Sequence, residues 1–215
     1  MHEHVTWNMI EEWVSAKREG KQQAEEIGEL IIEVDKGMIG IKHPKTGLLQ
    51  LVDPKDFGIR GLSGDAEIIV HRKEGGHYFV YLLNPGSDKL VLLEIIVEDA
   101  AFGVYPRDFE LGENISSNNY VVIDSETLAI CTKKVIFVVR GGTHIGITLE
   151  KAGVAGIENP VFGVGKSESH VWLAVMEKGA EEAVLVCLTD SDLGYAVRRK
   201  EKNELKDKEL MEEEG

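Results

Sequence analysis

The segment KVIFVVRGGTHIGITLE, residues 134–150, decides the fold because it joins two short apolar runs through a pair of glycines. Both runs are rich in Val and Ile, which favour β-strands. A hairpin turn often needs a positive φ, and Gly adopts it without strain. A phosphate-binding loop would lead from a strand into a helix, whereas ITLE continues as a strand. The segment therefore predicts a hairpin with its turn in RGGTH.

The same strand, turn and strand pattern recurs when the chain is compared with itself. A shift of 97 residues lays 38–52 on 135–149, and a shift of 105 lays 68–83 on 173–188. A loop insertion of eight residues in one half would account for the difference between the two shifts. We interpret the pattern as an internal duplication of a β-rich unit. The alternative is one larger mixed sheet without true repetition.

Short β-rich segments separated by turn clusters fill most of the chain after Leu30. The predicted fold is therefore α+β and mainly antiparallel β, with an N-terminal amphipathic helix followed by two related β-rich units. The expected divisions are 1–28 (N-terminal helical segment), 29–111 (first unit), 112–118 (linker), 119–198 (second unit) and 199–215 (charged tail). Strands are expected near 30–35, 38–43, 47–52, 66–72, 77–83, 89–97, 119–124, 127–132, 134–140, 144–149, 160–164, 170–176, 182–188 and 194–198.

The N-terminal helix carries apolar residues three and four positions apart, which places them on one side. These residues are Met9, Ile10, Trp13 and Val14. Asn8 is the expected N-cap. Leaving the four side chains in water would forgo roughly 1.5–3 kcal/mol each, so the helix must dock on something. It either packs on its own domain or docks on another subunit or partner.

A second candidate surface lies in AAFGVYPRDFELG, just before the expected linker. It contains Phe102, Tyr105, Arg107 and Phe109. Aromatic residues and Arg are enriched at the energetic centres of protein interfaces. Core or inter-domain packing is the alternative interpretation of the same residues.

The charge of the chain limits the class of partner. It has 38 acidic and 24 basic residues, a formal net charge of −14 and a pI near 5.0. Nonspecific nucleic-acid binding needs clustered Lys and Arg, so it is not expected. A protein partner with a basic surface is favoured. The preference for Glu, Lys, Ile and Val, with only three Gln, indicates a thermophilic source.

Cys131 and Cys187 stand alone in apolar segments, which predicts buried free thiols and no zinc or redox motif. The longest apolar runs fall far short of the ~20 residues of a membrane-spanning helix. The N-terminal residues lack the pattern of a secretory signal. A cytoplasmic location is expected, with no membrane association, metal or cofactor.

Residues that could act in catalysis or bind a ligand are scattered along the sequence. The residues expected to dock on a partner are instead grouped in the N-terminal helix and the aromatic segment. His71 and His77 should face opposite sides of a sheet if an even-length turn separates their strands. The leading hypothesis is a noncatalytic interaction or assembly factor, which docks on a protein or macromolecular complex through the helix and the aromatic segment; a homodimer fits the same pattern. The alternative is a small-molecule-binding protein or enzyme whose pocket lies between the two units, where Arg140, His144 and His170 would converge.

Overall fold

The computed structural model describes residues 5–16, 24–59, 62, 66–98, 101–166, 170–189 and 193–203. In this part of the chain the protein is mainly antiparallel β, with one N-terminal helix and four four-stranded sheets. Each sheet is a meander, in which every strand pairs with the next one in the chain. Such four-stranded meanders are also the units from which propeller blades are built.

The sheets are numbered in chain order. Sheet 1 contains β1 (Ala24–Ile27), β2 (Leu30–Asp35), β3 (Met38–His43) and β4 (Leu48–Val52). Sheet 2 contains β5 (Glu67–Glu74), β6 (His77–Leu83), β7 (Lys89–Glu98) and β8 (Ala101–Glu110). Sheet 3 contains β9 (Tyr120–Val122), β10 (Thr127–Cys131), β11 (Val135–Arg140) and β12 (Thr143–Thr148). Sheet 4 contains β13 (Pro160–Lys166), β14 (His170–Glu177), β15 (Glu182–Thr189) and β16 (Tyr195–Glu201).

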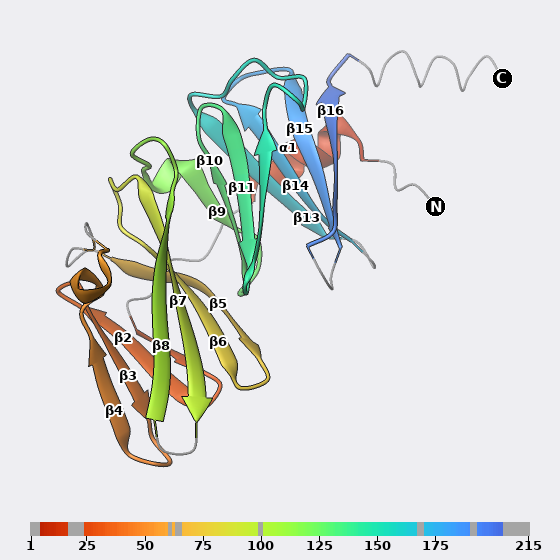
Figure 1. The fold of residues 1–215 in the computed structure, drawn as a ribbon. Coiled ribbons are helices and arrows are strands. Elements are labelled where there is room, and N and C mark those ends of the chain that lie inside the picture. The colour runs from red at the N-terminus through yellow and green to blue at the C-terminus, as the bar shows by residue number, and fades with distance from the viewer. Residues whose placement is uncertain are drawn as a thin grey trace.

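Consecutive sheets pack face to face, so the order along the chain is also the order in space (Figure 1). Apolar side chains such as Ile32 and Val80 fill the space between sheets 1 and 2. Tyr81 and Leu128 belong to the core between sheets 2 and 3. The core between sheets 3 and 4 includes Val138. Alternate residues of the strands in sheets 2 and 3 therefore serve two different cores, as expected for strands buried on both faces.

The helix α1 (Trp7–Ser15) covers the outer face of sheet 4, so the N-terminal element lies beside the last strands of the chain (Figure 1). Ile10 is completely buried there, and the Trp13 ring lies over Gly165 of β13. The helix thus packs on its own chain, one of the two arrangements considered. The cap prediction was wrong: Thr6 is the N-cap, and its hydroxyl accepts a hydrogen bond from the Met9 amide.

Two strands lie where the sequence did not predict them. The strand β1 falls inside the segment 1–28, which was expected to be helical. The segment with the aromatic residues forms β8, an edge strand in which Pro106 is tolerated because one side of an edge strand needs no ladder hydrogen bonds. In addition, β16 extends to Glu201, inside the expected tail; the tail after residue 203 lies outside the described residues.

The second shift, of 105 residues, matches strands that hold different positions in their sheets. The shift of 97 pairs the third and fourth strands of sheet 1 with the third and fourth strands of sheet 3. The shift of 105, however, lays β5 and β6 on β14 and β15, which pairs first and second strands with second and third ones. An eight-residue insertion is therefore not needed. Successive strands of a meander have similar apolar patterns, so a displacement by one strand still gives a plausible match.

The RGGTH segment forms the predicted hairpin turn between β11 and β12. Gly141 and Gly142 are its two central residues, and Gly141 has a φ of +55°. The Tyr81 hydroxyl donates a hydrogen bond of 2.6 Å to the Gly141 carbonyl. A Cβ on Gly142 would lie 3.1 Å from the Phe79 ring. The turn therefore packs against sheet 2, and its two glycines make this close approach possible.

Candidate protein interface

Arg140 is a buried structural residue that ties sheet 3 to sheet 4. Only 4% of its surface is exposed. Its Nε donates to the Thr127 hydroxyl at 2.7 Å, and its Nη1 donates to the Thr189 carbonyl at 3.2 Å. Its Nη2 lies 3.7 Å from an Asp124 carboxylate oxygen. These partners neutralise and satisfy a cation that would otherwise be costly to bury.

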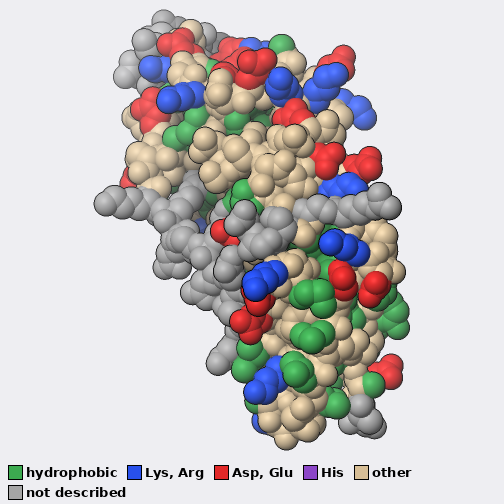
Figure 2. Space-filling model, turned by 90° about the vertical axis from the view of Figure 1, so that its left-hand side faces the viewer, with side chains coloured by type: hydrophobic (Ala, Val, Ile, Leu, Met, Phe, Trp, Pro, Cys, Tyr) green, Lys and Arg blue, Asp and Glu red, His purple; other side chains and the backbone are tan. Residues whose placement is uncertain are grey.

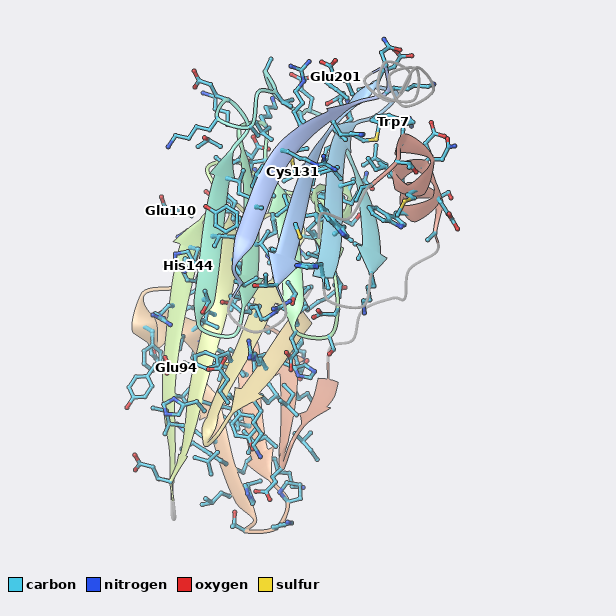
Figure 3. The ribbon with its side chains drawn as sticks, turned by 90° about the vertical axis from the view of Figure 1, so that its right-hand side faces the viewer. Trp7, Glu94, Glu110, Cys131, His144 and Glu201 are labelled. Atoms are coloured by element: carbon cyan, nitrogen blue, oxygen red, sulfur yellow. The ribbon has the colours of Figure 1, made fainter. Side chains whose placement is uncertain are left out.

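The alternative ligand site does not gather its three residues on one surface. Arg140 shares a face of sheet 3 with Thr127, directed at sheet 4. His144 lies opposite Val139, on the other face, and its ring centroid is 5.1 Å from that of Phe109 (Figure 3). His170 lies on β14 opposite Thr189 and shares the face of sheet 4 with Trp172, directed away from sheet 3.

The aromatic segment is divided between the two faces of sheet 2. Phe102 is buried in the core between sheets 1 and 2. Phe109 is half-buried against the core between sheets 2 and 3. Tyr105 is 55% exposed, and Arg107 is exposed beside it on the same face. The four residues therefore do not form one patch, and only Tyr105 and Arg107 present an accessible surface.

Glu94 connects the polar residues of this face of sheet 2. One of its carboxylate oxygens lies 3.4 Å from His77 Nδ1, and the other lies 3.7 Å from Arg107 Nη2. Figure 3 shows Glu94 on the lower pair of sheets, away from His144. His71 lies opposite Val80, and the two-residue turn places His77 opposite Glu74. The two histidines therefore face opposite sides, as predicted.

The outer face of sheet 1 is the most exposed apolar surface on a strand in the described residues. Leu49 and Leu51 on β4 are 66% and 67% exposed. Half-buried Ile31 on β2 and Met38 on β3 lie on the same face, and so does Gly40 on β3. Figure 2 looks onto this side, and hydrophobic side chains gather over its lower part, where Figure 1 has β2 to β4.

Sequence reasoning missed this surface, although β4 was predicted as a strand. The segment LLQLV has apolar residues at both parities, so alternation alone does not identify the face that is covered. The charged residues that share the outer face are Glu33, Asp35 and Lys42, which gives it an excess of acid. Apolar residues within a polar rim are typical of protein-binding surfaces.

The described residues contain no cluster of His, Cys, Asp or Glu with the geometry of a metal site. Cys131 is buried, and this burial raises the pKa of its thiol to about 12. Cys187, predicted to be buried, is half-buried. Among the described helices, none is both long and apolar enough to cross a membrane.

Comparison with known proteins identifies no relative from which a function can be transferred. The chain matches no known protein family and no curated protein sequence. Five chains of solved structures are similar to it; one comes from a structural and mechanistic analysis of two prolyl endopeptidases and the role of inter-domain dynamics in their catalysis and specificity. That match has 9% identity and a TM-score of 0.27, and it covers 81% of this chain and 35% of the other. The present chain thus spans about a third of that protein's length, and so distant a likeness carries no argument.

Proposed function

We propose that this protein is a noncatalytic interaction factor that docks a basic amphipathic helix of a partner protein on the outer face of sheet 1. The observation that carries the proposal is the exposure of Leu49 and Leu51 on a strand that is paired in a sheet. Leaving two leucines in water forgoes roughly 1.5–3 kcal/mol each, which is available for binding. A helix laid into an apolar surface is a common mode of peptide recognition.

The outer face of sheet 4 supports the choice of a helix as the occupant. It is the corresponding face at the other end of the stack, and it already holds the amphipathic helix α1. There Gly163 and Gly165 leave room for Trp13. Gly40 lies among the exposed residues of sheet 1 in the same way and contacts Leu51. A side chain from a partner helix would fit above this glycine.

Charge supports a basic partner. The chain carries a formal net charge of −14, and among the described residues of the outer face of sheet 1, Glu33 and Asp35 accompany one basic residue, Lys42. Complementary charges at the rim of an interface accelerate association and select the partner. Lys or Arg on the polar side of the incoming helix would meet these carboxylates.

The proposed docking surface on sheet 1 differs from the N-terminal helix and the aromatic segment, which the sequence suggested. The apolar side of α1 faces sheet 4, at the opposite end of the stack from sheet 1, so the helix is not part of the proposed docking surface. Tyr105 and Arg107 lie on the face of sheet 2 that points away from sheet 1, so they form a separate exposed surface and are not part of the proposed helix site.

We also propose that the two halves of the chain descend from one duplicated unit of two sheets. Strands β5, β6 and β7 begin at 67, 77 and 89, and strands β13, β14 and β15 begin at 160, 170 and 182, so each is displaced by 93 residues. This constant spacing supports the proposal. In this arrangement sheet 1 corresponds to sheet 3, whose equivalent outer face is covered by sheet 2.

A photo-crosslinking amino acid in place of Leu51 tests the proposed interface in cell extract. We expect crosslinks to one partner, at a helical segment that carries Lys or Arg beside an apolar stripe. The same amino acid in place of Tyr195 on β16 is the matched control. Like Leu51, Tyr195 is a large exposed side chain on an edge strand. The Leu49→Glu and Leu51→Glu changes should abolish capture, because they place carboxylates against the apolar stripe.

The possible results distinguish a helix of a partner protein from a second copy of this chain and from nonspecific contact. Crosslinks between two copies of this chain, with a doubled mass in light scattering that the Leu51→Glu change reduces, would mean a homodimer and would contradict the proposal. Identical crosslinked species from positions 51 and 195 would mean nonspecific contact and would also contradict it. Circular dichroism of the Glu variants checks that lost capture does not come from unfolding.

A further inference from the structure

The strand β12 is an edge of sheet 3 that lacks the usual protection against pairing. Of the described strands, β11 alone pairs with it. Its sequence, THIGIT, contains no Pro, Asp, Glu, Lys or Arg. The edge strands on either side of it do contain them: β8 has Pro106, Arg107 and Asp108, and β16 has Arg198 and Arg199. Charged residues and Pro keep edge strands from pairing, so β12 is open to an additional strand.

The strand register shows which backbone groups of β12 point outward. The residues that flank its two-residue turn form a hydrogen-bonded pair, and such pairs alternate with non-hydrogen-bonded ones along the hairpin. The Leu149 amide donates to the Lys134 carbonyl at 2.8 Å, which continues the same alternation beyond the strand. The amides and carbonyls of His144 and Gly146 therefore point away from β11. In the described part of the chain, no other strand or loop pairs with them.

A cleft of about 450 Å³ lies beside this edge, between β12 and β16. Tyr195 and Val197 line it on sheet 4, and Ile147 and Ala152 line it on the other side. Ile145, Ala152 and Val197 pack against the core between sheets 3 and 4 but are only partly buried. This core is therefore incompletely covered along the edge. A strand added to β12 directs alternate side chains into the cleft and covers these residues.

We propose that β12 binds an extended segment of a partner protein, which joins sheet 3 as an additional strand. The outward backbone groups of His144 and Gly146 hydrogen-bond to the segment, and its apolar side chains enter the cleft, as in other cases of strand addition. The residues that line the cleft include no Asp or Glu, and Lys151 among them forms no ion pair with a described residue. An acidic residue at the end of the segment complements this lysine.

The strands beside β12 favour a single extended segment over a second copy of this chain. The His144 ring centroid lies 5.1 Å from that of Phe109, so β8 flanks β12 on one side; Figure 3 shows Glu110 of β8 and His144 on the same side of the stack. The strand β16 flanks it across the cleft. Two copies joined through β12 would bring these charged flanking edges against those of the other copy, whereas one peptide strand avoids this contact.

Amide chemical shifts and hydrogen exchange of the full chain test the proposal with a short peptide in which Thr and Val alternate between terminal Glu residues. We expect saturable shifts with a Kd of about 1 mM or lower. The His144 and Gly146 amides should exchange more slowly in the complex, because they become hydrogen-bonded. The same peptide with N-methylated Thr and Val keeps the side chains but loses the backbone donors, so it should not bind.

Two changes at one position test the backbone of β12 itself. Gly146→Pro removes an outward amide and should weaken peptide binding by about tenfold or more. Gly146→Ala is the matched control: it keeps the amide, its Cβ would lie 3.8 Å from the Phe137 ring, and binding should stay within about twofold of wild type. Leu51→Glu should also leave binding unchanged, which separates this site from the proposed helix site on sheet 1. Circular dichroism checks the fold of each variant.

Several results would overturn the proposal, and those from the wild-type chain do not depend on a folded proline variant. They are the absence of saturable shifts up to about 5 mM peptide, unchanged exchange of the His144 and Gly146 amides, and equal binding of the N-methylated peptide. Equal binding by the folded Pro and Ala variants would do the same. A free chain that is dimeric in light scattering, and that Gly146→Pro converts to a monomer, would mean that a second copy occupies the edge.

Discussion

The two ends of the sheet stack have outer faces of opposite character. At one end α1 covers sheet 4, and Ile10 is completely buried in the contact. At the other end no described residue covers Leu49 and Leu51 of sheet 1. Both faces belong to four-stranded meanders with apolar residues at alternate positions. The fold of a sheet therefore does not determine whether its outer face is covered.

Side-chain size is what distinguishes the two faces. The outer face of sheet 4 carries small residues where α1 crosses it, and these are Gly163, Gly165, Ala174 and Ala183. They form a shallow surface into which large helix side chains fit. On β2, β3 and β4 of sheet 1, Gly40 is the small residue of the corresponding central region, and the leucines of β4 project outward. Small residues thus mark the face that is already occupied within the chain.

The largest effect is expected from removing apolar atoms on the covered face. Ile10→Ala should lower the free energy of unfolding by about 2–5 kcal/mol, because it leaves a cavity between α1 and sheet 4. Leu51→Ala on the exposed face should change it by less than about 0.5 kcal/mol. Urea unfolding followed by circular dichroism measures both. Equal losses for the two variants would mean that the faces do not differ in coverage.

Adding atoms to the two faces gives the next largest effect. Gly165→Val should cost about 1–3 kcal/mol, because its Cβ would overlap the Trp13 ring and displace the helix. The matched change Gly40→Val should be neutral or slightly stabilising, since the nearest side-chain atom to its Cβ would be Leu51 Cδ2 at 3.7 Å and valine favours strands. Tryptophan fluorescence should change only in the first variant. An unchanged spectrum for Gly165→Val would contradict the packing of α1 on β13.

The thiol of Cys131 reports on the core between sheets 3 and 4, and the thiol of Cys187 reports on the outer face of sheet 4. At pH 8 only about one in 10,000 Cys131 thiols is ionised, given a pKa of about 12, so iodoacetamide should barely modify it in the folded state. Cys187 lies beside Trp172 on the face that α1 covers, is half-buried, and should react faster. Ile10→Ala should accelerate Cys187 alone. Mass spectrometry of timed samples measures both rates, and acceleration of both sites would mean that the whole pair of sheets had loosened.

The smallest effect concerns two carboxylates with lowered pKa values. Hydrogen bonding to Lys45 lowers the pKa of Glu29 in sheet 1, and hydrogen bonds from the Asn159 and Glu158 amides lower that of Glu177 in sheet 4. Because these folded-state values lie below the usual 4.5, the stabilisation is present above pH 4.5 and is lost as the pH falls through the lowered value.

Salt separates the two carboxylates. Exposed ion pairs are screened, so about 0.5 M NaCl should return the pKa of Glu29 toward 4.5. The Glu177 pKa should change less, because backbone amides hold it. Carboxyl NMR titrations at low and high salt measure both values. Equal salt shifts would show that a charge, not the amides, determines the pKa of Glu177.

The sequence predicted most strands because apolar alternation and turn residues are local signals. The interval 77–83, for example, was predicted with the observed bounds of β6. The strand prediction failed at Ala24–Ile27. The segment AEEI has a composition typical of helices, and its pairing with β2 makes it a strand. The prediction also failed at β8, where Gly103 and Pro106 argue against a strand that an edge position tolerates.

The candidate surfaces were less predictable, because they depend on which faces meet after folding. Nothing local in β8 indicates that Phe102 enters a core while Tyr105 stays exposed on the opposite face. The faces of His71 and His77 were predicted correctly, because both residues belong to one short hairpin and residues alternate between the two faces of a strand.

The position of α1 on the last sheet has a consequence for biosynthesis. The helix is translated before any strand, but the surface that buries Ile10 is complete only when β15 has been made, up to Thr189. At roughly 5–20 residues per second, this interval lasts about 10–40 s on the ribosome. Throughout that time the tryptophans of the helix have no native surface to cover them. The nascent chain therefore exposes an apolar helix face that the finished molecule buries.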